Sequence, residues 1–362
     1  MSDGSLPRVA QMVLNVSVAD AITHHVLMID DELRLAGCSA GIFCENAHPD
    51  LASRAAPYAD FRDDAADVVL FHFSIGSRIA ARFAATPARK AIVYHNLTPP
   101  EFFDGINGRV AAALRAGRGE LRELVGKVDL ALGVSEFNRA ELAALGFART
   151  GVLPIAVPRD LAQVGPDPEW TARLAGRGPT LLHVGRLAPN KRIEDLIRVL
   201  AHVQRLEPKA ELLLVGTDRD TETYSMGLVE MARELGLTGV LMLGQIPPAA
   251  LAACYRAAAA YVCTSAHEGF CVPLVEAMHF DVPVVATAAG GIPETLGGAG
   301  VLLTERRWDV AAAATVLLHR DRELRSAVLA RQRERLRAFT RERFRDLLLG
   351  YVRSLAGGEA RG

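Results

Sequence analysis

Short apolar runs and segments with helical spacing alternate along most of the chain. The segment 21–36 has apolar positions three and four residues apart and ends before Gly37, which predicts a helix with a C-terminal glycine cap. Apolar runs in the same part of the chain predict strands at 9–18, 39–44, 68–73, 91–95 and 130–134. Strands that alternate with helices are typical of a parallel sheet covered by helices.

The stretch 153–179 interrupts this alternation with five prolines and three glycines, which predicts a linker with one short helix near 169–174. After it, the pattern predicts strands at 180–184, 210–215, 240–243, 260–264 and 282–286, and helices at 193–206, 223–235, 248–258 and 273–280. An Arg-rich helical stretch follows at 310–355. We therefore predict a first domain at 1–154, a linker at 155–178, a second domain at 179–340, and a final helix and tail at 341–362.

This organisation predicts an α/β fold of two doubly wound, Rossmann-like domains that face each other across a cleft. In such sheets, ligands bind beyond the carboxyl ends of the strands. Candidate functional residues are therefore expected directly after predicted strands.

Composition narrows the class of protein. Half of the 362 residues are hydrophobic and the formal net charge is −1, which excludes a disordered chain and argues against a general nucleic-acid binder. No apolar run is long enough to predict a membrane-spanning helix, and the N-terminus lacks the pattern of a signal peptide. The five cysteines have unrelated spacings and form no CxxC, so we interpret them as small buried residues of a reduced, cytoplasmic protein.

The densest cluster of candidate residues lies at 267–278, directly after the predicted strand 260–264. Gly269 allows the backbone to approach a ligand, and Pro273 suits the first turn of a helix, whose free amide groups can bind an anion. Glu268 and Glu276 on either side can accept hydrogen bonds from sugar hydroxyls. For this glutamate pair alone, a charged loop with a glutamate favoured by the helix dipole is the alternative.

Two further motifs follow strands. Gly185, Arg186 and Lys191 come after the strand 180–184, and two cations at a helix start are unfavourable unless an anion such as a diphosphate lies between them. An exposed basic turn is the alternative for this motif alone. The segment 290–294 reads Gly-Gly-Ile-Pro-Glu after the strand 282–286, and it is either a small anion-binding nest or a plain turn with a helix cap.

Together the three motifs read strand-Gly-Arg-x4-Lys, Glu-Gly-Phe-x-x-Pro-x-x-Glu-Ala and Gly-Gly-x-x-Glu. In this order they closely resemble the nucleotide-sugar half of retaining glycosyltransferases of family 4, which have the GT-B fold. The resemblance covers about 180–303. The chain is similar to bacterial members of this family that build polysaccharides. The resemblance implies that Arg186 and Lys191 bind the donor diphosphate, that Glu268 contacts the transferred sugar, and that Glu276 binds the ribose. It also implies donor contacts from Gly185, Gly216, Gly244, Gly269, Phe270 and Cys271.

In the N-terminal part, Val-Tyr-His-Asn at 93–96 resembles the family's strand that ends in a histidine near the donor sugar and phosphate. The resemblance implies that role for His95, with a structural histidine as the alternative. Many family members carry a Gly-Gly loop after the first strand, whereas this chain has Ser-Val-Ala-Asp-Ala-Ile-Thr at 17–23. We predict that Asp20 caps the following helix and that Asp20 and Ala21 form a variant donor loop. The GT-B fold further implies that the final helix crosses back to the first domain.

The resemblance thus implies a retaining, metal-independent hexosyltransferase with no bound cofactor, in which His95, Arg186, Lys191 and Glu268 are catalytic. Its partners would be a nucleoside-diphosphate sugar and a glycan, lipid-linked or small-molecule acceptor, with no nucleic acid. No Asp-x-Asp motif is placed to hold a metal ion. The basic segment 105–127 predicts either peripheral contact with the inner face of a membrane or an ordinary solvated helix face.

Four other functions are weighed against this one. A catalytically inactive GT-B subunit that scaffolds a partner transferase and a nucleotide-sugar 2-epimerase stay open as alternatives. A phosphorylase would need a pyridoxal-phosphate lysine, and the chain has only four lysines. A dinucleotide-dependent dehydrogenase is disfavoured because no Gly-x-Gly-x-x-Gly follows the first strand.

Overall fold

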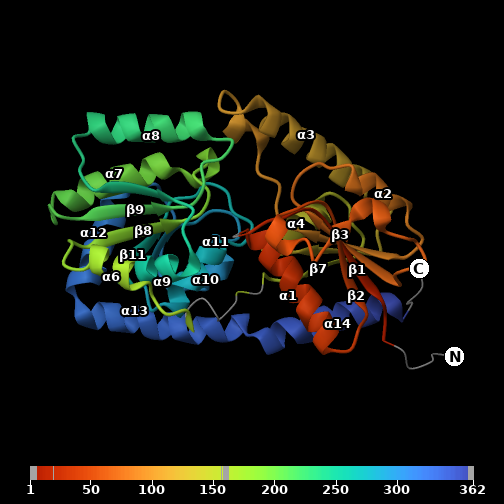
Figure 1. The fold of residues 1–362 in the computed structure, drawn as a ribbon. Coiled ribbons are helices and arrows are strands. Elements are labelled where there is room, and N and C mark those ends of the chain that lie inside the picture. Colours follow the sequence, from red (N-terminus) through yellow and green to blue (C-terminus); the bar gives the residue numbers. More distant parts are fainter. Residues whose placement is uncertain (1–5, 19, 156, 158–162, 358–362) are drawn as a thin grey trace. The chain divides into compact units, whose positions relative to one another are not determined.

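The computed structural model describes residues 6–18, 20–155, 157 and 163–357, which divide into two compact units. The first unit comprises the described residues within 1–99, 112–156 and 339–362. The second comprises those within 100–111 and 157–338. Each unit is a parallel sheet flanked by helices (Figure 1).

The first unit contains a parallel seven-stranded sheet with the order β3-β2-β1-β4-β5-β6-β7. Its strands are β1 (Val9–Val16), β2 (Ala40–Ala47), β3 (Ala56–Pro57), β4 (Val68–Phe73), β5 (Arg89–Tyr94), β6 (Leu130–Gly133) and β7 (Thr150–Val152). The helices with residues in this unit are α1 (Ala21–Leu35), α2 (Ile79–Ala85), α3 (Gly108–Glu123), α4 (Glu136–Ala144) and α14 (Arg341–Ala356).

Helices α1 and α14 pack against this sheet through apolar stripes. On α1, Val26, Ile29 and Leu33 are buried at helical spacing, and α14 buries Phe344 and Leu348 in the same way. Beside these stripes, the buried carboxylate of Glu32 on α1 accepts hydrogen bonds from two arginines of α14, Arg341 and Arg345. The last long helix of the chain is therefore bound to the first unit by both packing and charge.

The second unit contains a parallel six-stranded sheet with the order β10-β9-β8-β11-β12-β13. Its strands are β8 (Thr180–Val184), β9 (Glu211–Val215), β10 (Val240–Gly244), β11 (Ala258–Cys263), β12 (Val284–Thr287) and β13 (Val301–Leu303). Its helices are α6 (Pro168–Leu174), α7 (Ile193–Gln204), α8 (Glu222–Glu234), α9 (Pro248–Ala257), α10 (Val272–His279), α11 (Ile292–Leu296), α12 (Trp308–Arg320) and α13 (Arg322–Arg335).

Successive strand residues of the second unit point to opposite faces and build two separate apolar cores. Leu181 packs on one face with residues of α7, α8 and α12, whereas its neighbour Leu182 packs on the other with residues of α9, α10 and α11. Figure 1 shows α7 and α9 on opposite sides of this sheet. Because both faces are covered, the strands are continuous apolar runs, as the sequence showed.

The predicted fold class is confirmed: both sheets are parallel, doubly wound and covered by helices. The sequence analysis did not predict β3, β7 and β13, which lie at or near the sheet edges and are only two or three residues long. It also assigned all of 1–154 to one domain, whereas contacts group Pro100–Ala111 with the second unit. Part of the predicted linker (156 and 158–162), Ala19 of the variant loop and the tail at 358–362 lie outside the described residues.

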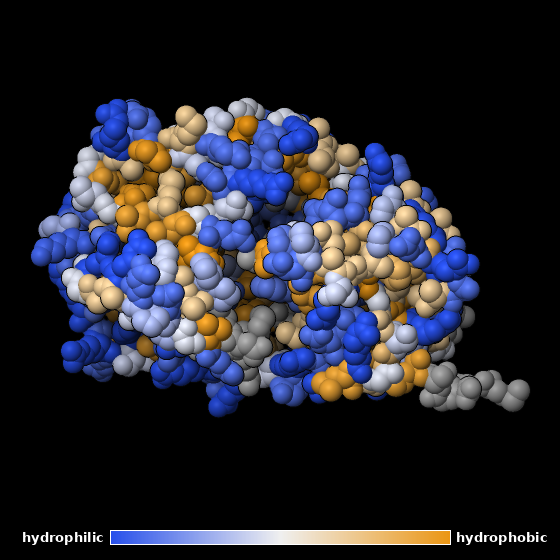
Figure 2. Space-filling model, viewed as in Figure 1, coloured by the Kyte–Doolittle hydropathy of each residue, from blue (hydrophilic) through white to orange (hydrophobic). Residues whose placement is uncertain are grey.

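The part of the basic segment 105–127 that belongs to the first unit, 112–127, contributes to the structure of that unit as well as to its surface. Arg118 donates a hydrogen bond to the carbonyl of Leu97, and the carboxylate of Glu120 accepts one from the amide of Ser77. Hydrophilic side chains cover much of the face shown in Figure 2. Among the described residues, no helix is both long and apolar enough to span a membrane.

Candidate functional site

In the second unit, two loops leave the carboxyl ends of the neighbouring strands β8 and β11, where the strand order reverses. This is the switch point at which doubly wound sheets bind ligands. The first loop carries Gly185, Arg186 and Lys191, and the second carries Glu268 to Cys271. The topology therefore brings together two of the motifs that the sequence placed after separate strands.

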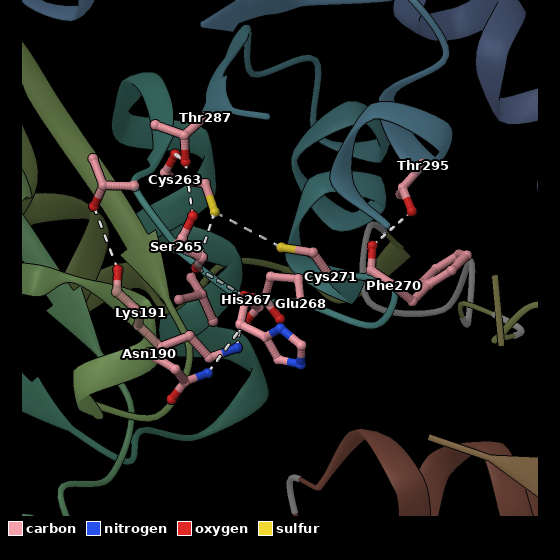
Figure 3. A network of polar contacts seen from close by, with 12 residues as sticks. Asn190, Lys191, Cys263, Ser265, His267, Glu268, Phe270, Cys271, Thr287 and Thr295 are labelled. Atoms are coloured by element: carbon pink, nitrogen blue, oxygen red, sulfur yellow. Dashed lines mark hydrogen bonds and ion pairs between the residues drawn. The ribbon is translucent and has the colours of Figure 1, made fainter. Parts of the chain in front are cut away.

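A buried ion pair joins the two loops. The Nζ atom of Lys191 lies 2.7 Å from Oε1 of Glu268, which also accepts a hydrogen bond of 2.8 Å from the Ser265 hydroxyl (Figure 3). The side chains of Lys191 and Glu268 are only 22% and 9% exposed. Burial acts to lower the pKa of Lys191, but the Glu268 carboxylate outweighs that effect, so the pKa of Lys191 is raised and its charge is kept.

Polar contacts to the backbone hold the Glu268 loop rigidly. The carbonyl of His267 accepts a hydrogen bond from the Asn190 amide, and the Thr287 and Thr295 hydroxyls donate to the carbonyls of Ser265 and Phe270 (Figure 3). The loop is therefore fixed by side chains from the segment after β8, from β12 and from α11.

The glycine pair of the third motif packs directly against this loop. The amide of Gly291 donates a hydrogen bond of 2.9 Å to the carbonyl of Glu268. Gly290 has a φ of +54°, and a Cβ atom there would lie 2.1 Å from the same carbonyl oxygen. Only glycine fits this close approach without moving the loop. In the structure, the third motif supports Glu268.

Three further glycines meet where β8, β9 and β10 end. Gly185 and Gly216 have φ values of +148° and +143°, and a Cβ atom on Gly216 would lie 2.0 Å from the carbonyl oxygen of Gly185. The amide of Gly216 donates to the carbonyl of Gly244 at 2.9 Å. The structure thus brings together Gly185, Gly216 and Gly244, and Gly185 directly precedes Arg186.

The N-terminus of α10 follows Glu268 closely in the sequence. Gly269 and Phe270 are buried, Cys271 caps the helix with a left-handed φ of 69°, and Pro273 occupies its first turn. Along the same helix, Oε2 of Glu276 accepts a hydrogen bond of 2.7 Å from the hydroxyl of Tyr255. Burial raises the pKa of Glu276, although this hydrogen bond acts in the opposite direction.

Arg186 is the more exposed of the two cations. Its guanidinium donates to the carbonyl of Arg219 and lies 3.8 Å from the carboxylate of Asp220. Asp220 also lies 3.5 Å from Arg109, which belongs to the segment that groups with this unit. Asp220 is thus shared by two arginines, a feature that the sequence motifs did not reveal.

The candidate residues of the first unit lie at the ends of β1 and β5. Asp20 caps α1, because its carboxylate accepts a hydrogen bond of 2.8 Å from the amide of Thr23, as predicted. Ala21 is the first residue of that helix. His95 follows β5, and its Nε2 atom lies 2.9 Å from Nδ1 of His72. Burial lowers the pKa of His95 to about 3, so the imidazole is neutral.

Among the residues that the structure describes, two clusters contain atoms of the kind that ligate metals. His25, His72 and His95 each offer a ring nitrogen within 4.8 Å of the others, and so do ligand atoms of Cys263, Glu268 and Cys271. In the second cluster, Glu268 already pairs with Lys191, a cation that competes with any metal ion. In the first, two of the three imidazoles hydrogen bond to each other. A hydrogen bond within the protein thus accounts for the placement of His72 and His95, whereas both ring nitrogens of His25 are buried without a hydrogen-bond partner among the described residues.

Sequence reasoning missed the residues that support the predicted ones. Ser265 precedes Glu268 by three residues, and a hydroxyl side chain at this spacing was the one signal in the sequence that could have pointed to the contact. Tyr255 and Thr287 come from other elements and carry no motif. All five cysteines are buried thiols, as the sequence analysis interpreted them.

Comparison with known proteins identifies the second unit. Residues 170–335 match the family described as glycosyl transferases group 1. The D-inositol 3-phosphate glycosyltransferase of Segniliparus rotundus is 33% identical over 165 residues, 43% of this chain and 37% of that protein. The O-antigen chain mannosyltransferase B of Escherichia coli is 28% identical over 231 residues, 61% of this chain and 60% of that protein.

A third relative is the GDP-mannose-dependent alpha-(1-6)-phosphatidylinositol monomannoside mannosyltransferase of Mycolicibacterium smegmatis, 31% identical over 197 residues, 51% of this chain and 50% of that protein. The matched part of the chain thus spans between 37% and 60% of these three relatives. The structure of Anabaena HepE in complex with UDP-glucose has a TM-score of 0.75 at 18% identity, over 96% of this chain and 100% of that one. The structure of WaaG, a glycosyltransferase of lipopolysaccharide biosynthesis, has a TM-score of 0.71 at 14% identity, over 97% and 100%.

The resemblance to glycosyltransferases is therefore confirmed: residues 170–335 match the group 1 glycosyl transferases, and the fold is GT-B. Membership of family 4 in particular stays a prediction.

Proposed function

We propose that this protein is a retaining glycosyltransferase that moves a sugar from a nucleoside-diphosphate sugar to an acceptor hydroxyl in polysaccharide or glycoconjugate assembly. The observation that carries the proposal is the buried Lys191–Glu268 pair at the switch point of a group 1 glycosyl transferase domain. Such a pair places a cation and a sugar-binding carboxylate next to a helix N-terminus.

The leaving group of the reaction is a nucleoside diphosphate, which carries negative charge as the glycosidic bond breaks. Arg186, Lys191 and the amides before α10 would neutralise that charge without a metal ion. Gly185 and Gly216 carry no side chains, so phosphates could approach their backbone closely. This combination of fixed cations and amides supports metal-independent transfer.

The two glutamates would bind different parts of the donor. Glu268 accepts hydrogen bonds from hydroxyls of the transferred sugar, and its contacts with Lys191 and Ser265 fix its orientation. Glu276 accepts hydrogen bonds from the ribose, and the Tyr255 hydroxyl holds it in place. His95, Asp20 and Ala21 of the first unit complete the donor site in this proposal. A phosphate oxygen of the donor takes the proton of the attacking hydroxyl on the same face of the sugar, which gives retention.

The class of acceptor is proposed from the relatives. Their names describe transfer to an inositol phosphate, a phosphatidylinositol mannoside and an O-antigen chain. We therefore propose a hydroxylated glycan, lipid-linked or inositol-type acceptor. For a lipid-linked acceptor, the exposed arginines of α3 would provide peripheral contact with an anionic membrane surface.

The experiment that tests the donor site is a thermal-shift titration with UDP, GDP, ADP and dTDP in the presence of EDTA. A diphosphate at about 100 times its Kd adds about 2.7 kcal/mol of apparent stability. We expect one nucleotide to stabilise the wild type, and we expect the Lys191→Met variant to lose that stabilisation. The matched control is Lys209→Met, which removes an exposed lysine of the same unit and should respond like the wild type.

Transfer itself is then measured with the matching nucleotide sugar and candidate acceptors, with the anomeric configuration of the product read by NMR. A product of unchanged configuration supports the proposal. Stabilisation by a nucleotide without turnover on any acceptor would instead favour an inactive subunit. Absence of stabilisation by all four nucleotides would refute the donor site.

A further inference from the structure

A line of hydrogen bonds crosses the sheet of the first unit and ends at His95. The amide Nε2 of Gln11 donates to the carbonyl of Val26 at 3.0 Å, and Oε1 of Gln11 lies 2.9 Å from Nε2 of His72. Nδ1 of His72 then lies 2.9 Å from Nε2 of His95. Gln11 and His72 are fully buried side chains on neighbouring strands.

The register of three strands creates this line. Val13 of β1 pairs with His72 of β4, and His72 pairs with Val93 of β5. Gln11 lies two residues before Val13 and His95 two residues after Val93, so all three polar side chains share one face of the sheet.

The chemistry of each group fixes the direction of every hydrogen bond. A backbone carbonyl only accepts, so the Gln11 amide nitrogen faces Val26 and its oxygen faces His72. That oxygen also only accepts, so His72 carries its proton on Nε2 and keeps a lone pair on Nδ1. His95 must then donate from Nε2, which leaves a lone pair on its own Nδ1.

The free end of the line is the Nδ1 atom of His95, which is buried and without a hydrogen-bond partner among the described residues. Buried polar atoms are nearly always satisfied, so an acceptor left open at the end of a fixed line indicates a missing donor. The His25 ring, 5.3 Å from that of His95, packs edge-on against it. Burial and the neighbouring imidazoles also lower the pKa of His25 and of His72, so the cluster stays neutral.

We infer that Gln11 and His72 are positioning residues that hold His95 neutral with its proton on Nε2, so that Nδ1 accepts a hydrogen bond from a hydroxyl of the sugar substrate. The identity of that donor rests on the proposed function. The protonation pattern itself rests only on the hydrogen bonds of the first unit.

The protonation pattern is tested by long-range ¹H–¹⁵N correlation spectra of the protein labelled with ¹⁵N-histidine at pH 7, assigned by single histidine substitutions. We expect both His72 and His95 to be neutral with the proton on Nε2. A proton on Nδ1 of either ring, an imidazolium, or the shifts of a metal-bound nitrogen would overturn the inference. The protonation states are read from the spectrum of the wild type, and the substitutions serve only to assign each signal to its histidine.

The positioning role is tested with Gln11→Met, which keeps the length of the side chain but removes the acceptor for His72. We expect the spectrum of His95 to change to a mixture of the two neutral forms. The matched control is Gln332→Met, which removes another buried glutamine whose amide links two backbone groups, those of Val282 and Val284. The histidine spectrum of this control should match that of the wild type.

Kinetics separate this inference from the proposed function. For Gln11→Met we expect kcat/KM for the nucleotide sugar to fall about tenfold, the value of one hydrogen bond, while the Kd for the free nucleoside diphosphate is unchanged. An unchanged kcat/KM would overturn the positioning role. Failure of the wild type to bind any nucleoside diphosphate would refute the proposed function, whereas the spectra would still decide the protonation pattern.

Discussion

The Lys191–Glu268 pair should contribute to folding as well as to donor binding, and a double-mutant cycle can separate the two effects. Lys191→Met removes the cation and leaves the Glu268 carboxylate, 9% exposed, with the Ser265 hydroxyl beside it. Removing one partner of a buried ion pair typically costs 3–5 kcal/mol. We expect a loss of about 3 kcal/mol, at the low end, because the 22% exposure of Lys191 lets some water reach the site.

The double variant Lys191→Met, Glu268→Gln removes the stranded charge. A neutral amide can still accept from Ser265, so we expect its stability to lie within about 1 kcal/mol of the wild type. The coupling energy between the two positions would then be at least about 2 kcal/mol. Turnover should behave differently: both single variants and the double variant should lose at least about tenfold, because each removes a group that binds the donor.

Urea unfolding followed by tryptophan fluorescence is a suitable assay. The two tryptophans of the chain, Trp170 and Trp308, both lie in the second unit, so the signal reports on the unit that contains the pair. Lys209→Met should leave the transition unchanged. Destabilisation of the double variant by the sum of the two single changes would contradict a buried, coupled pair.

Two further perturbations test other parts of the structure. The folded pKa of His95, about 3, lies below its unfolded value of about 6.5, so stability is full above pH 6.5 and falls as the pH decreases. The protonation of His95 alone should lower the free energy of unfolding by about 2 kcal/mol between pH 7 and pH 5, measured by urea unfolding with circular dichroism. If His95→Gln left the pH dependence of the free energy of unfolding unchanged, this prediction would be wrong. Gly290→Ala should lower the affinity for the nucleoside diphosphate in isothermal titration, because its Cβ would lie 2.1 Å from the Glu268 carbonyl. The control Gly227→Ala, which meets nothing within 4 Å, should bind like the wild type; equal affinities for the two variants would show that the loop adapts.

Much of the fold could be predicted because its signals are local. Strands buried on both faces are continuous apolar runs, and the linker is rich in proline and glycine, so element order and sheet type followed from the sequence. The edge strand β3 has only two residues and no such run. The grouping of Pro100–Ala111 with the second unit depends on contacts with residues far along the chain, such as the hydrogen bond from Asn107 to the carbonyl of Asp220.

The candidate site was predictable only in part, because some of its contacts also join residues that are far apart in the sequence. Lys191 and Glu268 each follow a predicted strand, so the rule for doubly wound sheets placed both at the carboxyl ends of strands, but it is the strand order of the structure that brings them together. The support for His95 has no comparable signal. Gln11 and His72 are 61 positions apart, and their contact depends on the register of β1 and β4, which a sequence pattern does not specify.

The candidate residues of the two units differ in charge. The second unit holds charges, because the leaving diphosphate is an anion that fixed cations and amides can stabilise. The first unit holds a neutral cluster, and the proposed contact of His95 with the sugar would favour this neutrality, because the sugar becomes positively charged as the bond breaks. Burial lowers the pKa of all three histidines and so keeps them neutral. A neutral imidazole still offers a nitrogen for hydrogen bonding but carries no positive charge.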